Sequence, residues 1–306
     1  MQTQEAYFVA QFQPDLPPGV FNRSVARGQA VGQAIREWAD GDGYAALHNC
    51  AYAPPAGDGL WTPTPPGYRP ALQPCWGQIR PLVLEAGSQC SPAPPPAYSE
   101  EPDSLFYQEA WEVYDVVNNL TPEQLAIALY WADDPGLTGT PPGHSIAILG
   151  QVLAQQEASL ALAAEAYARV GIAVADAFVA CWWTKYEYNL LRPITYVHNV
   201  LGDGAWVTPV NTPPFPEYTS GHSVQSAAAA QVMTDLFGEI SFTDQTHVSL
   251  GYAPRTFASF FAYAEEAAIS RLYGGIHFRA AIELGIAQGK CIGQRVSAIG
   301  FRAEQE

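Results

Sequence analysis

Helical periodicity is the feature that most constrains the fold of this chain of 306 residues. In eight segments, apolar residues recur every three or four positions, the spacing that places them on one face of an α-helix. The segments are 22–38, 105–117, 122–131, 145–169, 171–191, 222–237, 255–272 and 277–298. Strand-like alternation of apolar and polar residues is scarce. The sequence therefore predicts an all-α helical bundle, and residues 1–306 are expected to form a single helical domain.

One helix also has a readable start. Thr121 has the side chain of an N-cap, Pro122 suits the first helical position, and Gln124 stands where a capping box places its glutamine. These local signals predict that a helix begins at residue 122.

Residues 41–103 interrupt the helical pattern with many prolines and glycines. Such a stretch is either a long irregular excursion that lies on the bundle or a disordered linker. Trp61, Tyr68 and Trp76 favour the first alternative, because large aromatic side chains gain free energy when they are buried.

Three short fragments in the second half of the chain carry the functional signal. Together they supply three cations, two histidines and a hydroxyl, which are the donors that an oxyanion site requires. Lysine occurs only twice in the chain, so a lysine at a motif position is not a product of a basic composition. The fragments are Lys185-x6-Arg192-Pro193, Ser220-Gly221-His222 and Ser270-Arg271-x5-His277.

Local geometry can bring the members of each fragment to one anion. Lys185 and Arg192 are seven residues apart, which is two turns of helix, so they are expected on one helical face. Pro193 disfavours helical geometry at Arg192 and places that residue at a helix C-terminus or on the turn after it. Gly274-Gly275 interrupts the third fragment, so Arg271 is expected to end one helix and His277 to begin another.

The Ser220-Gly221 pair precedes the helical segment 222–237. A helix N-terminus offers unpaired amides and the positive end of the helix dipole to an anion. The alternative is that Ser220 acts only as an N-cap for this helix.

The three fragments resemble the signature of the vanadium-dependent haloperoxidases, which share a helical fold with the type 2 phosphatidic acid phosphatases and the bacterial class A acid phosphatases. The family pattern is Lys-x6-Arg-Pro, then Pro-Ser-Gly-His, then Ser-Arg-x5-His. This chain has the same order and spacing, except that Thr219 replaces the proline. The resemblance carries motif support over residues 182–290, and residues 1–103 carry no recognisable signature.

The resemblance implies a role for each motif residue. His277 is the vanadium ligand, or the nucleophile that becomes phosphohistidine in the phosphatases, and His222 is the general acid–base. The remaining donors neutralise the oxygens of the bound anion. These donors are Lys185, Arg192, Arg271, Ser220 and the Gly221 amide. The family often has an aspartate four residues after the ligand histidine, and this chain has Ala281 there, so another residue must orient His277.

Two aromatic residues favour halide oxidation within this superfamily. Trp182 and Phe215 match aromatic residues that line the vanadate pocket in fungal chloroperoxidases and bacterial iodoperoxidases, although ordinary core packing is the alternative. The stretch Pro141-Pro142-Gly143-His144 is similar to one that lies near the site in bacterial members, which gives His144 an expected role beside the pocket. Asp133 and Asp134 are either partners of Arg271 or of a histidine, or solvated turn residues.

Charge and hydropathy exclude several other classes of function. The net charge is −16, which argues against binding to nucleic acid and to anionic membranes. No apolar run reaches the roughly 20 residues that a membrane-spanning helix requires. Several of the 14 basic residues belong to the motifs, so a cationic pocket lies in an acidic protein and selects small anions.

The five cysteines suggest an oxidising location. Cys75 and Cys90 flank part of the proline-rich excursion and are expected to form a disulfide, whereas Cys181 and Cys291 lie in apolar helical patterns and are expected to be buried thiols. This pairing, with the family resemblance, favours a periplasmic or secreted protein.

The function that these observations favour is vanadate-dependent oxidation of iodide or bromide by hydrogen peroxide to hypohalous acid. Phosphate is then the competing occupant of the vanadate site. The first alternative is a soluble acid phosphatase that hydrolyses a small phosphomonoester through the same residues. The second is a non-catalytic phosphate- or vanadate-binding protein, against which the acid–base His222 argues. A homodimer is also expected, because subunit pairing is common among soluble enzymes.

Overall fold

The computed structural model describes residues 2–301 of the chain. The chain divides into two compact units, residues 1–46 and residues 47–306. The first unit contains α1 (Gln2–Phe12), η1 (Gln13–Asp15) and α2 (Pro18–Asp40), and α3 (Tyr44–Leu47) lies at the boundary of the two units. The helix predicted over 22–38 is therefore present, with a start at Pro18, a residue type favoured in the first helical turn. A single domain over residues 1–306 stays a prediction.

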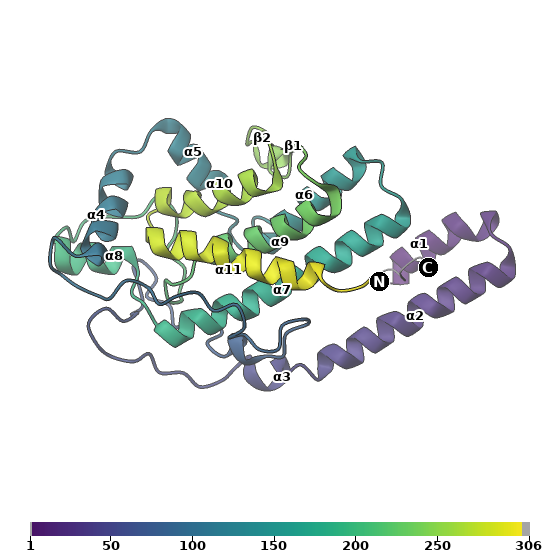
Figure 1. Ribbon diagram of the computed structural model, residues 1–306, viewed down its shortest axis with the longest axis horizontal. Helices are drawn as coiled ribbons and strands as arrows, with labels where there is room; N and C mark the ends of the chain where they lie inside the picture. The colour runs from purple at the N-terminus through teal and green to yellow at the C-terminus, as the bar shows by residue number, and fades with distance from the viewer. Residues whose placement is uncertain (1, 302–306) are drawn as a thin grey trace. The chain divides into compact units, whose positions relative to one another are not determined.

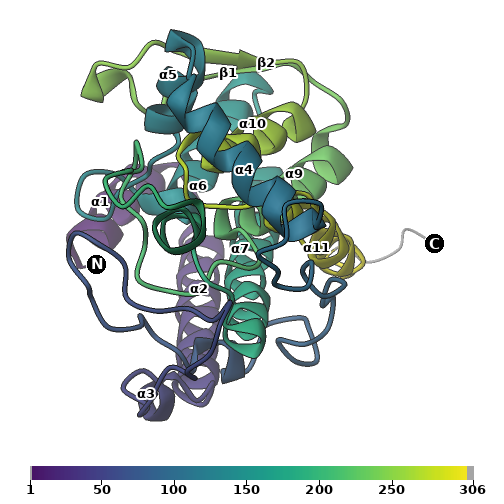
Figure 2. The ribbon, with the colours of Figure 1, turned by 90° about the vertical axis from the view of Figure 1, so that its left-hand side faces the viewer.

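The second unit is a bundle of helices with one two-stranded antiparallel sheet (Figures 1 and 2). The all-α prediction is confirmed. The helices are η2 (Trp76–Gln78), α4 (Leu105–Asn118), α5 (Pro122–Tyr130), α6 (Thr140–Gln155), α7 (Leu160–Tyr188), α8 (Pro193–Tyr196), η3 (Val197–Leu201), α9 (Gly221–Phe237), η4 (Val248–Leu250), α10 (Phe260–Tyr273) and α11 (Arg279–Ser297). The strands are β1 (Phe242–Asp244) and β2 (Arg255–Phe257). The predicted start at residue 122 is confirmed, because Thr121 and Gln124 form the capping box.

Helix α9 is the centre of this bundle, and it packs against α6, α7, α10 and α11. Its alanines 227–230 are fully buried, because small side chains let neighbouring helices approach closely. Helix α11 comes so near that a Cβ atom on Gly289 would lie 2.2 Å from the carbonyl oxygen of Val224. The two helices therefore fix each other, and the N-terminus of α9 is held in a defined place.

Two predicted helix boundaries are wrong. The segments 145–169 and 171–191 were expected as separate helices, but the break lies earlier, between the end of α6 at Gln155 and the start of α7 at Leu160. The side chain of Ser159 caps α7 by accepting a hydrogen bond from the N–H of Leu162. Residues 255–257 form β2 rather than the start of a helix, since they pair with β1.

The part of the proline-rich stretch 41–103 that lies in the second unit docks on the helices of that unit, as predicted. Trp61 is fully buried, and the ring of Trp76 stacks on Phe178 with centroids 5.7 Å apart. Tyr68 does not contribute, because it is 65% exposed. The buried carboxylate of Asp176 on α7 accepts the N–H groups of residues 82, 83 and 84 at 2.6, 2.8 and 2.9 Å. This anchor satisfies backbone groups that an irregular segment cannot pair by itself.

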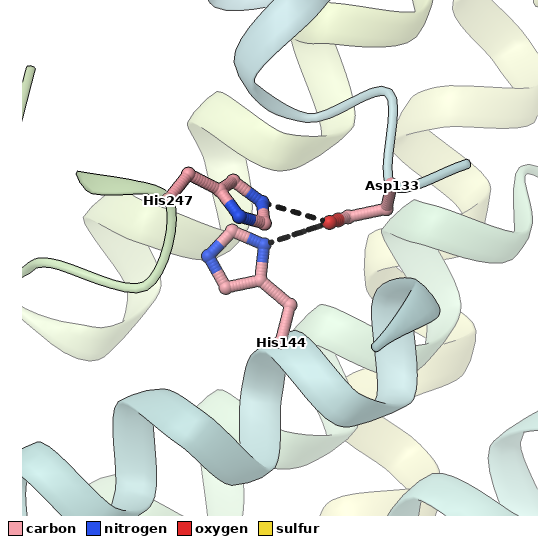
Figure 3. A group of neighbouring side chains, drawn as sticks. All are labelled: Asp133, His144 and His247. Atoms are coloured by element: carbon pink, nitrogen blue, oxygen red, sulfur yellow. Dashed lines mark hydrogen bonds and ion pairs between the residues drawn. The ribbon is translucent and has the colours of Figure 1, made fainter. Parts of the chain in front are cut away.

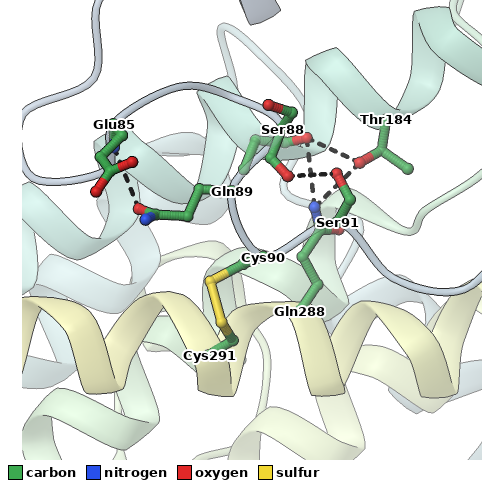
Figure 4. The surroundings of a disulfide bond; sticks show 9 residues. Glu85, Ser88, Gln89, Cys90, Ser91, Thr184, Gln288 and Cys291 are labelled. Atoms are coloured by element: carbon green, nitrogen blue, oxygen red, sulfur yellow. Dashed lines mark hydrogen bonds between the residues drawn. A yellow bond between two sulfur atoms is a disulfide. The ribbon is translucent and has the colours of Figure 1, made fainter.

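The disulfide prediction is wrong in its pairing. Cys90 bonds Cys291 (Figure 4). Cys50 bonds Cys75, so Cys75 and Cys90 are both oxidised but not to each other. The helical pattern around Cys291 did not indicate that the excursion passes over α11 at this residue. Cys181 is a free and buried thiol, as predicted.

No helix among residues 2–301 combines the length and the apolar character needed to cross a lipid bilayer.

Candidate anion site

The three motif fragments meet at one place in the second unit. Lys185 lies in the last turn of α7, Arg192 is the N-cap of α8, and Ser220 is the N-cap of α9. Arg271 lies in the last turn of α10, as predicted, and His277 immediately precedes Phe278, the N-cap of α11. Helix ends thus supply most of the site, and they leave backbone N–H and C=O groups free for other partners.

Lys185 and Arg192 do not share a helical face, so that prediction is wrong. Helix α7 ends at Tyr188, because Asn189 adopts the left-handed conformation (φ 47°). Arg192 has the extended conformation that Pro193 was predicted to impose, with φ −85° and ψ 154°. The turn nevertheless brings both cations to the ring of Phe215, with Lys185 Nζ 5.1 Å and Arg192 Cζ 5.0 Å from its centroid.

Lys185 holds the backbone of the loop before α9. Its ammonium group donates to the carbonyl oxygens of Pro216 at 3.0 Å, of Glu217 at 2.9 Å and of Thr219. These three bonds use all three of its hydrogen atoms. Burial lowers the pKa of Lys185 to about 7. Lys185 therefore fixes the loop, and its charge is only partly present near neutral pH.

Arg192 has one donor left over. Its Nε donates to the carbonyl of Phe215 at 2.9 Å, and its Nη1 donates to Ile276 O at 2.8 Å. Its Nη2 is buried without a hydrogen-bond partner among residues 2–301. Burial lowers the pKa of Arg192 to about 10, so the group stays charged at neutral pH. A buried, charged and unpaired N–H group is costly, and an anion would offset that cost.

His277 is oriented by a residue that the sequence analysis missed. Its Nδ1 lies 2.7 Å from Oε1 of Glu217, and its Nε2 lies 3.2 Å from Nη1 of Arg192, which can only donate. The proton is therefore on Nδ1, and Nε2 carries the lone pair that a metal ligand needs. Burial, followed by the charge of Arg192, lowers the pKa of His277 well below its usual value and keeps the ring neutral.

Glu217 is itself fully buried. Its Oε1 also accepts the N–H of Phe278 at 2.9 Å. Burial raises the pKa of Glu217 to about 8, against the opposing charges of Arg192 and Lys185, and in either protonation state Oε1 remains an acceptor. The sequence held one signal for this residue: Glu217 is the only acidic residue between positions 204 and 234.

The start of α9 has the geometry that the sequence predicted. The Oγ of Ser220 accepts the N–H of Ser223 at 3.3 Å, so Ser220 does act as an N-cap. This bond uses an oxygen lone pair and leaves the hydroxyl hydrogen free to donate. Gly221 is the first residue of the helix. That these two residues also bind an anion stays a prediction.

His222 lies close to the charged groups of the site. Its side chain is 15% exposed, and its Nε2 has no hydrogen-bond partner among residues 2–301. Burial, followed by the charge of Arg271, lowers the pKa of His222 to about 3. The imidazole is therefore neutral at working pH and has an available lone pair, which is what a general base requires.

Arg271 is held by Oγ of Ser270 at 2.9 Å and by the carbonyl of Ala128 at 3.1 Å. Burial lowers its pKa to about 10, and the negative charges of Asp133 and Asp134 act against this shift. Asp133 is buried and bonds histidines, so of the alternatives considered for it, a histidine partner is the one observed.

His144 reaches the site through Asp133 rather than directly. Its Nδ1 lies 3.1 Å from Oδ2 of Asp133, and the same oxygen lies 3.9 Å from Nε2 of His222. Burial alone would lower the pKa of His144, but hydrogen bonds to Asp133 and Asp244 outweigh it and raise the pKa to about 9. Seen from His222, His144 thus lies beyond Asp133, and Asp244 lies beyond His144.

The two aromatic residues have different places. Phe215 lies against both cations, whereas Trp182 contacts Phe215 with ring centroids 4.9 Å apart. Trp182 also packs against Trp76, and its Nε1 donates to Leu72 O at 3.3 Å. Phe215 therefore lies directly against the two cations, and Trp182 lies behind it in the core.

These contacts place buried cations, the Nε2 lone pair of His277 and the unpaired Nε2 of His222 in one region of the second unit. Comparisons with known proteins agree with this geometry. The family described as the second helical-bundle domain of VCPO matches residues 165–208 and 203–303. Vanadium chloroperoxidase from Curvularia inaequalis is 34% identical over 137 residues, which cover 37% of this chain and only 22% of that protein.

Solved structures extend the likeness to almost the whole chain. The crystal structure of the first bacterial vanadium-dependent iodoperoxidase is 42% identical, with a TM-score of 0.86 over 96% of this chain and 72% of that one. An apo-type bacterial vanadium-dependent chloroperoxidase has a TM-score of 0.67 over 81% of this chain and 65% of that one, and at 16% identity it shares the fold. The site, the family match and the 42% identity lead to one conclusion: this chain belongs to the family of vanadium-dependent haloperoxidases.

Proposed function

We propose that this chain oxidises halide with hydrogen peroxide to hypohalous acid, with vanadate held at His277. The observation that carries the proposal is the neutral imidazole of His277, whose Nε2 lone pair lies beside Arg192 while Nδ1 is held by Glu217. Histidine ligands of metals usually have this arrangement, in which the second ring nitrogen donates to a carboxylate.

The residues present fit an oxyanion such as vanadate. Nη2 of Arg192 and Nε2 of His222 are buried polar atoms without a partner among residues 2–301. Arg192 and Arg271 are charged and almost fully buried. A small anion would accept from Nη2 of Arg192 and be attracted by the charges of both arginines. The hydroxyl of Ser220 and the amide of Gly221 would add donors at the start of α9. The charge of Lys185 acts at the same place.

Bound vanadate would act as a Lewis acid that activates hydrogen peroxide toward attack by halide. The protein's part is to move protons. Nε2 of His222 accepts a proton from hydrogen peroxide and returns it when water leaves. The overall reaction converts halide, hydrogen peroxide and one proton to hypohalous acid and water. His222 suits the first step because its pKa, lowered to about 3, leaves Nε2 unprotonated.

Iodide or bromide is the proposed substrate. The ring of Phe215 gives the site an apolar wall, beside which a large, polarisable and weakly hydrated anion loses less solvation than a small one. The relative at 42% identity is an iodoperoxidase, which supports iodide. The disulfides Cys50–Cys75 and Cys90–Cys291 support a periplasmic or secreted location. A homodimer stays a prediction.

The test uses one purified sample, freed of bound anion and titrated with orthovanadate. Oxidation of iodide and of bromide by peroxide is followed beside the hydrolysis of a chromogenic phosphomonoester. Halide oxidation that rises with vanadate while phosphatase activity falls is the expected result. Phosphate added to the loaded enzyme should compete with vanadate and lower the oxidation rate.

Two results would contradict the proposal. Rapid phosphate release without vanadate-dependent oxidation would indicate an acid phosphatase that uses the same residues. Vanadate binding without either activity would indicate a non-catalytic anion-binding protein. A His277→Ala variant is the control, because any activity that survives this change does not depend on the proposed ligand.

A further inference from the structure

A second group of side chains lies behind the anion site and has no part in the proposed reaction. It consists of Asp133, His144 and His247, which come from three separate segments (Figure 3). Asp133 follows α5, His144 lies in the first part of α6, and His247 is the N-cap of η4. The side chains are only 1%, 1% and 4% exposed.

The donor atoms of these side chains converge. Nδ1 of His144 lies 3.1 Å from Oδ2 of Asp133, and Nε2 of His247 lies 3.0 Å from Oδ1 of the same carboxylate. All three residues offer a donor atom within 4.8 Å of the others. Ligands of a tetrahedral zinc ion, with bonds of about 2.0–2.2 Å, lie about 3.4 Å apart. The two distances to Asp133 would each lengthen by a few tenths of an ångström to reach this spacing.

The surroundings already hold His144 as a metal site holds its histidine. Nε2 of His144 lies 2.7 Å from Oδ2 of Asp244, which leaves Nδ1 as the atom that faces Asp133. Asp244 is fixed in turn by the hydroxyl of Tyr130 at 2.6 Å and by the N–H of Thr246 at 2.9 Å. A carboxylate on the second nitrogen sets the orientation and raises the basicity of a histidine ligand.

We propose that Asp133, His144 and His247 form a binding site for a divalent transition-metal ion, with Zn²⁺ as the best match. Two imidazole nitrogens and one carboxylate oxygen suit Zn²⁺, whereas Mg²⁺ and Ca²⁺ prefer oxygen ligands alone. The ion takes the place of the hydrogen atoms that the two rings now donate to Asp133, and water completes its coordination.

The position of this site links it to the anion site. Oδ2 of Asp133 lies 3.9 Å from Nε2 of His222. Only the carboxylate of Asp133 would therefore separate a bound ion from the proposed acid–base residue. Binding of the ion does not rest on the proposed function.

The binding test measures Zn²⁺ directly and needs no enzymatic activity. The untagged full chain, treated with a chelator, is incubated with Zn²⁺, passed through a desalting column and analysed for bound metal. Co²⁺ serves as a spectroscopic probe, because tetrahedral nitrogen and oxygen coordination intensifies its visible absorption. We expect one ion per chain and a rise in Tm with Zn²⁺ concentration.

Three variants locate the ion. His247→Gln removes one ligand with little change in volume and should lower Zn²⁺ affinity at least 100-fold, with loss of the Co²⁺ spectrum. His198→Gln is the matched control, since His198 bonds the carbonyl of Trp206 outside the cluster. His277→Ala should bind Zn²⁺ as the wild type does, which separates this site from the vanadate site. The unliganded Tm of each variant shows whether it is folded.

The proposal fails if the wild type takes up no Zn²⁺ in a saturable manner, or if folded His247→Gln binds it with unchanged affinity. The cluster would then be a hydrogen-bonded network only. Failure of the halide assay in metal-free wild type would overturn the proposed function and leave this site intact.

Discussion

Glu217 orients the imidazole of His277, with Oε1 of Glu217 2.7 Å from Nδ1 of the ring. The same oxygen accepts the N–H of Phe278, so one buried carboxylate fixes both the ring and the backbone beside it. The resembling family often supplies this carboxylate four residues after the histidine, where this chain has Ala281. Here it comes instead from the loop that precedes α9.

Replacement of Glu217 should therefore weaken vanadate binding. We expect Glu217→Ala to lower vanadate affinity by about 10- to 100-fold, since the ring loses the partner that fixes its tautomer. Glu217→Gln should lose less, because its amide oxygen can still accept the Nδ1–H. Isothermal titration with vanadate measures both, and Tm reports on folding. Glu109→Gln is the control, since Glu109 accepts the N–H of Ala280 at 3.1 Å without touching His277. Unchanged affinity in Glu217→Ala would refute the positioning role.

The two site histidines should separate binding from turnover. His277→Ala removes the proposed ligand and should abolish vanadate coordination. His222→Gln should retain vanadate affinity within a few-fold but lose at least 100-fold in kcat, because general acid–base catalysis typically contributes about 10²–10⁴-fold. Vanadate titration and halide oxidation on the same samples measure the two effects. Full activity in His277→Ala would show that the site has been misread.

The two disulfides should differ in their contribution to stability. Cys90–Cys291 joins residues 201 apart, whereas Cys50–Cys75 joins residues 25 apart. In the chain-entropy description, loops of these lengths stabilise the fold by about 5 and about 3 kcal/mol respectively. We expect the Cys90→Ser/Cys291→Ser variant to lose more free energy of unfolding in urea than Cys50→Ser/Cys75→Ser. The reverse order would indicate that residual structure in the unfolded chain outweighs loop length.

Tyr196 should make the fold sensitive to alkaline pH. Its hydroxyl donates to the carbonyl of Ser99 at 2.7 Å, and burial raises its pKa from 10.0 to about 12. The folded state thus favours the protonated phenol. This contribution to stability is complete below pH 10 and is lost as pH rises through 12. The free energy of unfolding of wild type should therefore fall relative to Tyr196→Phe between pH 10 and 12, and a constant difference would contradict the assignment. The other tyrosines are present in both proteins, so their contributions to the pH dependence of stability cancel in the difference.

The sequence predicted those features that depend on neighbouring residues. Three of these features follow from interactions within a few residues. They are the capping box at Thr121, the extended backbone at Arg192 before Pro193, and the N-cap at Ser220. The order and spacing of the motifs also identified the residues that meet at the site. Interactions of this range involve residues that are close in the sequence, so the sequence alone is enough to predict them.

Features that depend on distant partners were not predictable in the same way. Residues 255–257 carry a helical spacing, but pairing with β1 makes them a strand. Cys90 lies in the excursion and finds Cys291 on α11, although nothing near either residue indicates the other.

The sequence by itself determined a helical chain with a cationic, two-histidine motif, because periodicity, capping and motif spacing are local properties. Tertiary structure alone decided that Glu217 orients His277 and that Asp133 brings His144 and His247 to the edge of the site. Each of these contacts pairs a buried polar group with a partner from another segment. Burial makes such a partner necessary, but many acidic residues could serve, and only the packing of the helices brings one of them within hydrogen-bonding distance.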